Sequence, residues 1–283
     1  MNLISALINY DGFSNSEKAA ADYIAKNIDD CLRLSVEKIG ELSFTSGPTV
    51  SRVIKKLGYG SFADFKIDLA RCQEAQTWVT DFSVPFQSDD DEKTIINKMK
   101  TLHVESVERV IENVGTDVLK KVAGMIAEAR EVTLFGKGPS FFICEDFGEK
   151  LRRIGIKATS ITSQNDIWTQ SYTQNERDMT ILISFYGRSA SYIGLCNWLK
   201  KKGVKAVTVT GVEGNPLSKA GDVNICLNSK EKYDKIAAFE SRTEMQFALD
   251  ILYCYLFQLN YDYNLIKVKE NIDNISEYRG KNF

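Results

Sequence analysis

Residues 45–58 read TSGPTVSRVIKKLG, and this stretch decides the fold of the N-terminal part of the chain. Ser46 is a residue type that caps helices, and Gly58 suits the left-handed position that ends them. Between them, apolar side chains recur at helical spacing: Val50, Val53, Ile54 and Leu57. The opposite face holds Pro48, Ser51, Arg52 and Lys55, with Thr49 and Lys56 on its flank. The pattern predicts an amphipathic helix with one buried side and one side rich in hydroxyls and cations.

A shorter helix is predicted directly before it, over Val36–Leu42, with Ser35 as its cap and an apolar face that includes Leu42. Two helices joined by a tight turn form a helix-turn-helix, whose second helix fits the major groove of DNA. There, arginine and lysine reach guanine edges, and hydroxyls reach phosphates. Between Ser46 and Lys66, four basic residues stand against one acidic residue, a local charge of +3 in a chain of net charge −2. Spacing alone fits an ordinary amphipathic helix with a solvated charged face equally well.

Two stretches make the pattern more specific. Residues 35–42 read SVEKIGEL, and residues 46–66 read SGPTVSRVIKKLGYGSFADFK. Together they resemble the helix-turn-helix of the RpiR/MurR family of transcription regulators. The resemblance implies binding to double-stranded DNA as a homodimer or homotetramer on a palindromic operator. It places these residues where the recognition helix meets DNA: Ser46, Thr49, Ser51, Arg52 and Lys55, with Lys56 at the edge of that face.

The remaining N-terminal pattern sets the expected domain boundaries. A capping box at Ser14 to Glu17 opens one helix, and Ser61 with Asp64 opens another. After residue 76 the periodicity is lost, and the acidic run at 89–92 precedes a helix from about Lys93 to Asn113. We therefore expect a DNA-binding domain over 1–76, a linker with a connecting helix over 77–105, and a second domain over 106–283.

The second domain alternates short apolar runs with helical segments. Strands are expected at Val132–Phe135, Lys157–Ile161, Thr180–Ser184, Lys205–Thr210 and Val223–Leu227. Helices are expected at Thr116–Ala129, Phe141–Arg153, Ser189–Lys202 and Ala237–Leu259. This alternation predicts an α/β fold, a parallel sheet with helices on both faces, behind an all-α N-terminal domain.

Two of these strands end in turns that suit a phosphate. The first turn reads FGKGPS (135–140) and the second reads SFYGRS (184–189). Gly138 and Gly187 let the backbone approach an anion, and the following helix N-termini supply N–H groups. The carboxyl ends of neighbouring parallel strands are where such sheets bind ligands. A dinucleotide is excluded, because Phe141 stands where a third glycine is needed and no acid closes the second strand.

This half of the chain resembles a SIS (sugar isomerase) domain, so that the two resemblances together extend from Ser16 to about Asn260. The resemblance implies that Ser140, Ser184 and Ser189 hold the phosphate of a sugar phosphate. The sequence departs from the family pattern at Tyr186, where a serine is usual, and at Arg188, where an acid is frequent. Arg188 either supplies a compensating charge or is a solvated residue. Glu240 either contacts sugar hydroxyls or stabilises the first turn of the last helix.

The alternative function is a phosphosugar isomerase with an accessory helical domain. Aldose–ketose isomerisation needs a base, and histidine suits ring opening, but His103 is the only histidine and lies in the connecting helix. A pure interaction protein would leave both phosphate turns unused. We expect no catalytic residue and no cofactor. A metal site is not expected either, because the six cysteines are far apart and form no C-x-x-C pair. Without a membrane-length apolar run or a signal peptide, the protein is expected in the cytoplasm.

Overall fold

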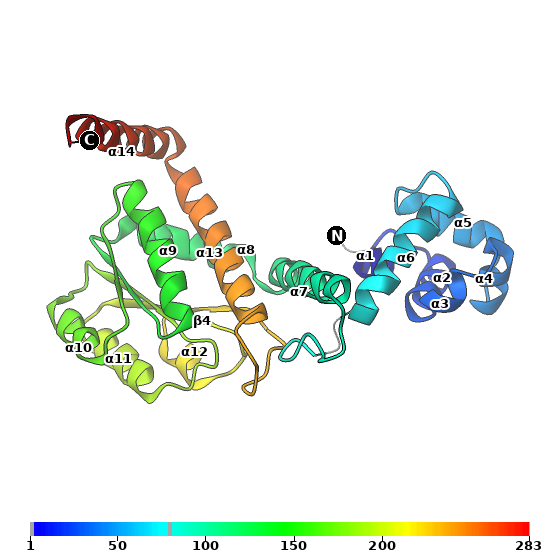
Figure 1. Ribbon diagram of the computed structural model, residues 1–283, viewed down its shortest axis with the longest axis horizontal. Coiled ribbons are helices and arrows are strands. Elements are labelled where there is room, and N and C mark those ends of the chain that lie inside the picture. The colour runs from blue at the N-terminus through cyan, green and yellow to red at the C-terminus, as the bar shows by residue number, and fades with distance from the viewer. Residues whose placement is uncertain (1–2, 79–80, 283) are drawn as a thin grey trace. The chain divides into compact units, whose positions relative to one another are not determined.

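The computed structural model describes residues 3–78 and 81–282, which fall into two units (Figure 1). The first unit extends to Asp81 and also contains Pro85–Leu102. The second unit contains Phe82–Val84 and continues from His103. None of the helices within these described ranges is long and apolar enough to span a membrane.

The first unit is built of short helices. They are α1 (Leu3–Asn9), α2 (Asn15–Lys26), α3 (Ile28–Cys31), α4 (Val36–Leu42), α5 (Gly47–Lys56) and α6 (Phe62–Trp78), followed by the start of α7 (Glu92–Asn113). The predicted capping box of α2 is confirmed, since Ser14 and Glu17 each bond the other's backbone N–H. Ser35 caps α4 as predicted, and Gly58 follows α5 with a φ of 89°. The local sequence signals thus define where these helices begin and end.

The core of this unit follows the predicted stripe of α5. Val50 and Val53 are fully buried and pack with Ile24, Ile39 and Phe65. One expectation is corrected: Leu42, the last residue of α4, is 40% exposed and lies outside the core cluster, whereas Ile39 of the same helix is fully buried in it. The helix α6 continues to Trp78, so the expected boundary at residue 76 falls within its last turn.

The second unit holds a five-stranded parallel sheet in the order β2-β1-β3-β4-β5. The strands are β1 (Val132–Phe135), β2 (Ala158–Ile161), β3 (Met179–Ile183), β4 (Lys205–Thr210) and β5 (Val223–Cys226). All five predicted strands are confirmed to within one residue at each end. Since β1 lies between β2 and β3, the chain reverses its direction across the sheet between β1 and β3. This is the switch point at which ligands bind in such sheets.

Helices cover both faces of the sheet (Figure 1). On one face lie α8 (Thr116–Glu128), α9 (Pro139–Arg153) and α13 (Glu240–Leu259), and their apolar residues form the larger core cluster. On the other lie α10 (Gln164–Thr173), α11 (Ala190–Lys201) and α12 (Pro216–Ala220). The predicted α/β sandwich with helices on both faces is therefore confirmed.

Three helices of this unit were not expected from the sequence: α10, α12 and α14 (Tyr261–Asn282). The first is rich in Asn, Ser and Thr, which are poor helix formers, yet the burial of Ile167 holds it on the sheet. The last lacks a clear apolar face, and Tyr261, Tyr263 and Ile266 are all more than half exposed. Tertiary packing and length, rather than periodicity, account for these helices.

Candidate functional site

The outer face of α5 is the first candidate site. Arg52 and Lys55 are exposed, Ser51 is half-buried, and Ser46 stands exposed at the N-cap. The α5 helix follows α4 after a short turn at 43–46, which gives the geometry of a helix-turn-helix. Opposite this face, Val50 and Val53 anchor the helix in the core. Hydroxyls and cations are therefore presented together on one rigid helical surface.

Glu17 organises part of this surface from α2. Its buried carboxylate lies 2.7 Å from Lys56 Nζ and 3.5 Å from Arg52 Nε. The Lys56 ammonium, together with the Ser14 backbone N–H, holds the pKa of Glu17 at about 2. Lys56 is thus committed to an ion pair within the domain, whereas Lys55 has no ion pair among the described residues.

The structure corrects the expectation for Thr49. Its side chain is buried, at 5% exposure, on the same helix as the exposed Arg52 and Lys55. Its Oγ1 accepts a hydrogen bond from Arg52 Nη2 at 3.0 Å and lies 3.0 Å from Ser46 Oγ. Thr49 therefore contacts Arg52 and Ser46 through a buried hydroxyl and is not part of the outer face.

The second candidate site is a cavity of about 250 Å³ at the carboxyl ends of β1 and β3. The two predicted turns meet there, with Ser140 at the start of α9 and Ser184 and Ser189 before α11. Both helices point their N-termini, which carry partial positive charge, toward this end of the sheet. Gly138 and Gly187 shape the turns with positive φ angles of 55° and 59°.

Two lysines line the same cavity, and neither was singled out in the sequence. Lys137 stands in the first turn, with its Nζ 5.6 Å from the centre of the Tyr192 ring. Lys235 comes from the loop before α13, and its Nζ lies 4.7 Å from the centre of the Phe185 ring. Hydroxyls, ammonium groups and helix N-termini are the groups that bind phosphate, and here they converge on one cavity.

Family models match both parts of the chain. A helix-turn-helix domain of the rpiR family matches residues 1–76, and a SIS domain matches residues 125–255. The chain therefore combines an rpiR-family helix-turn-helix domain with a SIS domain. Among its relatives is an uncharacterized HTH-type transcriptional regulator of Clostridium perfringens, 27% identical over 85% of this chain and 86% of that protein. Another is the HTH-type transcriptional regulator HexR of Pseudomonas aeruginosa, 22% identical over 86% of this chain and 84% of its own length.

A solved relative matches the whole architecture of this chain. This relative is the NanR protein of Vibrio vulnificus, complexed with ManNAc-6P. The match covers 98% of this chain and 99% of the NanR chain. The two share 21% sequence identity and superpose with a TM-score of 0.62. At this identity the likeness concerns the fold, which the two proteins share from the helical N-terminal part through the sheet.

Two residues expected at the phosphosugar site lie elsewhere. Arg188 is exposed and does not line the cavity, since Gly187 turns the chain away before α11 begins. Glu240 is fully buried behind the cavity wall, with its Oε1 3.1 Å from Arg109 Nη2. Its neighbour Ser241 lines the cavity in its place. Tyr186 does line the cavity, and its hydroxyl donates to the Lys232 carbonyl oxygen at 2.5 Å.

Arg109 on α7 joins two buried carboxylates of α13. Its Nε lies 3.2 Å from Glu244 Oε1, and the second oxygens of Glu240 and Glu244 have no hydrogen-bond partner among the described residues. Burial, together with the neighbouring Glu240, raises the pKa of Glu244 to about 8. Burial also raises the pKa of Glu240. One guanidinium balances one carboxylate, so the second carboxyl group holds a proton at neutral pH.

This arrangement predicts a pH-dependent stability of the second unit. Unfolding returns Glu244 to a pKa near 4.5, so the folded state holds an additional proton between about pH 4.5 and 8. The unfolding free energy therefore falls as pH rises through this window, by at most about 1.4 kcal/mol per pH unit. Glu244→Gln removes the titrating proton and should flatten this dependence, whereas the exposed Glu149→Gln should keep it.

Urea unfolding followed by tryptophan fluorescence at pH 6 and pH 8 measures the effect, because Trp168 and Trp198 lie in this unit. An equal pH dependence in wild type and Glu244→Gln would contradict the assignment of the proton.

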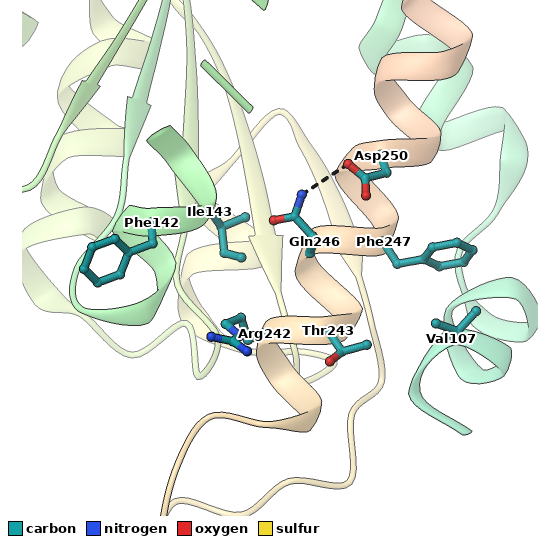
Figure 2. A pocket seen from close by; sticks show the side chains of 8 residues that line it. All are labelled: Val107, Phe142, Ile143, Arg242, Thr243, Gln246, Phe247 and Asp250. Carbon is teal, nitrogen blue, oxygen red and sulfur yellow. Dashed lines mark hydrogen bonds between the residues drawn. The ribbon is translucent and has the colours of Figure 1, made fainter. Parts of the chain in front are cut away.

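Another, larger cavity of about 510 Å³ lies between α7, α9 and α13 (Figure 2). It is lined by Val107, Phe142, Ile143, Arg242, Thr243, Gln246, Phe247 and Asp250. Two of its polar residues are paired with each other, since Gln246 Nε2 donates to Asp250 Oδ1 at 3.2 Å, and Lys150 from outside the lining also pairs with Asp250. This larger cavity is lined by one cation and one carboxylate, whereas the smaller cavity at the sheet edge is lined by two lysines and no carboxylate.

Proposed function

We propose that this protein is a DNA-binding transcription regulator whose operator affinity is controlled by a phosphorylated sugar bound at the sheet edge. The observation that carries the proposal is the meeting of four serines, two lysines and two helix N-termini in one cavity of a chain that also contains a helix-turn-helix. The family and the NanR relative, which was solved with ManNAc-6P, support the same assignment.

For the DNA contact we propose the outer face of α5. Arg52 and Lys55 reach base edges or phosphates, and Ser46 and Ser51 donate to phosphates. Lys56 adds charge at the edge of the surface while it pairs with Glu17. Thr49 supports Arg52 from within the fold.

For the phosphosugar we propose that Ser140, Ser184 and Ser189 donate to the phosphate, with Gly138 and Gly187 shaping the turns. Lys137 and Lys235 supply the positive charge that the sequence had suggested for Arg188, because they line the cavity and Arg188 does not. The small volume favours a single phosphorylated monosaccharide over a nucleotide.

Calorimetry on the full chain tests the site with glucose 6-phosphate, fructose 6-phosphate and N-acetylmannosamine 6-phosphate. A hydrogen bond to a charged phosphate is worth about 1.5–3 kcal/mol, so Ser184→Ala should weaken binding about tenfold or more. Arg188→Ala is the matched control from the same turn and should bind as wild type does, because its side chain is exposed outside the cavity. A large loss in Arg188→Ala with none in Ser184→Ala would contradict this placement.

The cavity lining favours a sensor over an isomerase. The lining residues include no carboxylate and no histidine. His103 is half-buried elsewhere, with its Nδ1 2.7 Å from Thr243 Oγ1, and burial lowers its pKa. Proton transfer between two sugar carbons needs a positioned base. The phosphosugars that bind should therefore be recovered unchanged, and aldose–ketose conversion would favour the isomerase alternative.

We further propose that the chain works as a homodimer or homotetramer. On α13, Leu249, Leu252 and Leu256 are buried against the sheet, but Leu259 is 53% exposed. Exposed apolar residues continue along α14 at Tyr261, Tyr263, Ile266 and Ile272. Such surface marks an association site, and a two-fold dimer would match a palindromic operator. Light scattering at micromolar concentration should give at least twice the chain mass, and a monomer would contradict the proposal.

A further inference from the structure

A three-residue piece of the linker is inserted in the second unit. Phe82–Val84 belongs to that unit, although Asp81 before it and Pro85 after it belong to the first unit. Phe82 is 8% exposed and Ser83 is 1% exposed. This burial is unusual for a connecting segment, which normally runs over the protein surface.

Ser83 is held by the loop that joins β5 to α13, residues 227–239. The Lys232 N–H donates to Ser83 Oγ at 2.8 Å, and the Ile236 N–H donates to the Ser83 carbonyl oxygen at 3.0 Å. Phe82 is held beside it by two cations, with Arg109 Cζ 5.1 Å and Lys230 Nζ 5.8 Å from the centre of its ring. The linker segment is therefore fixed at several points by one loop and by Arg109, whose side chain is 10% exposed.

The same loop forms a wall of the phosphosugar cavity. Lys235 lines the cavity and pairs with Glu231, whose carboxylate also accepts from Ser241 N at 2.9 Å and Ser241 Oγ at 2.7 Å. The Tyr186 hydroxyl, from the second phosphate turn, donates to the Lys232 carbonyl oxygen. Lys232 thus contacts the phosphate turn through its C=O and Ser83 through its N–H.

An anion in the cavity competes with Glu231 for the Lys235 ammonium. A phosphate that attracts Lys235 would weaken its pair with Glu231 within the loop, to which Lys232 and Ile236, the residues that hold Ser83, also belong. We propose that Phe82 and Ser83 are the anchor through which occupancy of the sugar cavity is transmitted along the linker to the DNA-binding unit. The inference rests on the proposed function, of which it describes the regulation. Coupling of this kind is reciprocal, so DNA binding must also act on the 227–239 loop.

Two variants of the full chain test the anchor, Phe82→Ala and Ser83→Ala. Phe86→Ala and Ser88→Ala are matched controls from the same linker, because Phe86 is 37% exposed and Ser88 is exposed. The readout is affinity for a duplex selected from random DNA by the protein itself, with and without the three hexose phosphates named above. Both anchor variants should bind the duplex and the sugar as wild type does. The effect of the sugar on DNA affinity, typically about 5–150-fold, should fall by at least about threefold in them and persist in the controls.

Hydrogen exchange of the 227–239 loop supplies a second readout that needs no sugar. Adding the selected duplex to wild type should change amide exchange in this loop, and the change should be absent in Ser83→Ala, which removes one hydroxyl and keeps the chain folded. If none of the hexose phosphates binds wild type, the proposed function fails, and the DNA-induced exchange still decides the anchor. An exchange pattern unaffected by DNA in wild type, or a full sugar response in both anchor variants, would overturn the inference.

Discussion

The double variant Arg52→Ala/Lys55→Ala is expected to bind its selected DNA duplex about a hundredfold or more weakly than wild type. Each side chain is exposed on the outer face of α5, and a bidentate contact to a base is worth about 1–3 kcal/mol. If either residue contacts only phosphate, the loss should be similar for all sequences. The slope of log affinity against log salt should then decrease by about one for each lost contact.

The fold should tolerate this change, because Val50, Val53 and Ile54 on the opposite face carry the packing of α5. Arg71→Ala is a matched control, since Arg71 is a cation of the same unit whose side chain is 74% exposed on α6. Fluorescence anisotropy at two salt concentrations measures the effect. Unchanged affinity in the double variant, with a wild-type melting curve, would place the recognition surface on another helix.

Gly187→Ala is expected to destabilise the second unit and to abolish phosphosugar binding. Gly187 has a φ of 59°, and a Cβ at this position would lie 1.8 Å from Asn215 Oδ1. Asn215 cannot move freely, because its Oδ1 accepts from the Ser218 N–H and its Nδ2 donates to the Val212 carbonyl oxygen. Left-handed backbone costs about 1–2 kcal/mol and overpacking about 1–3 kcal/mol, so the total loss is about 2–5 kcal/mol.

Gly194→Ala is the control, because Gly194 lies within α11 and a Cβ added there would meet no heavy atom within 4 Å outside its own helical turn. Alanine favours a helix over glycine by about 1 kcal/mol, so this variant should be neutral or more stable. Urea unfolding and calorimetry with hexose phosphates give the two readouts. If Gly187→Ala binds the sugar and resists urea as well as wild type does, the second turn does not form the site.

The elements that local signals define could be predicted from the sequence. Ser14 and Ser35 mark helix starts because their side chains accept a backbone N–H, and Gly58 marks a helix end because it adopts a positive φ. The apolar runs of β1 and β4 have the predicted bounds. Parallel pairing of β1 with β3 follows from strand–helix alternation, which brings the two phosphate turns together. These helix ends, strand bounds and strand pairings are determined by residues that lie close together in the chain.

The parts that were missed depend on distant contacts. Lys137 stands within a turn that the sequence had marked, and its position between two glycines was a usable signal. Lys235 lies in a loop without periodicity, and only the fold brings it to the second turn. Thr49 was expected on the DNA-facing surface and Glu240 at the sugar site or in the first turn of its helix, but both side chains are buried. A helical pattern gives the direction of a side chain and leaves open what packs against it.

The most direct test of the whole account is a titration of the full chain with the selected duplex in the absence and presence of glucose 6-phosphate, fructose 6-phosphate and N-acetylmannosamine 6-phosphate. At least one phosphosugar should shift the DNA dissociation constant about fivefold or more, while the same sugar without its phosphate leaves it unchanged. The Ser184→Ala variant should need about tenfold more of that phosphosugar for the same shift. Tight DNA binding that none of these phosphosugars alters would contradict the account.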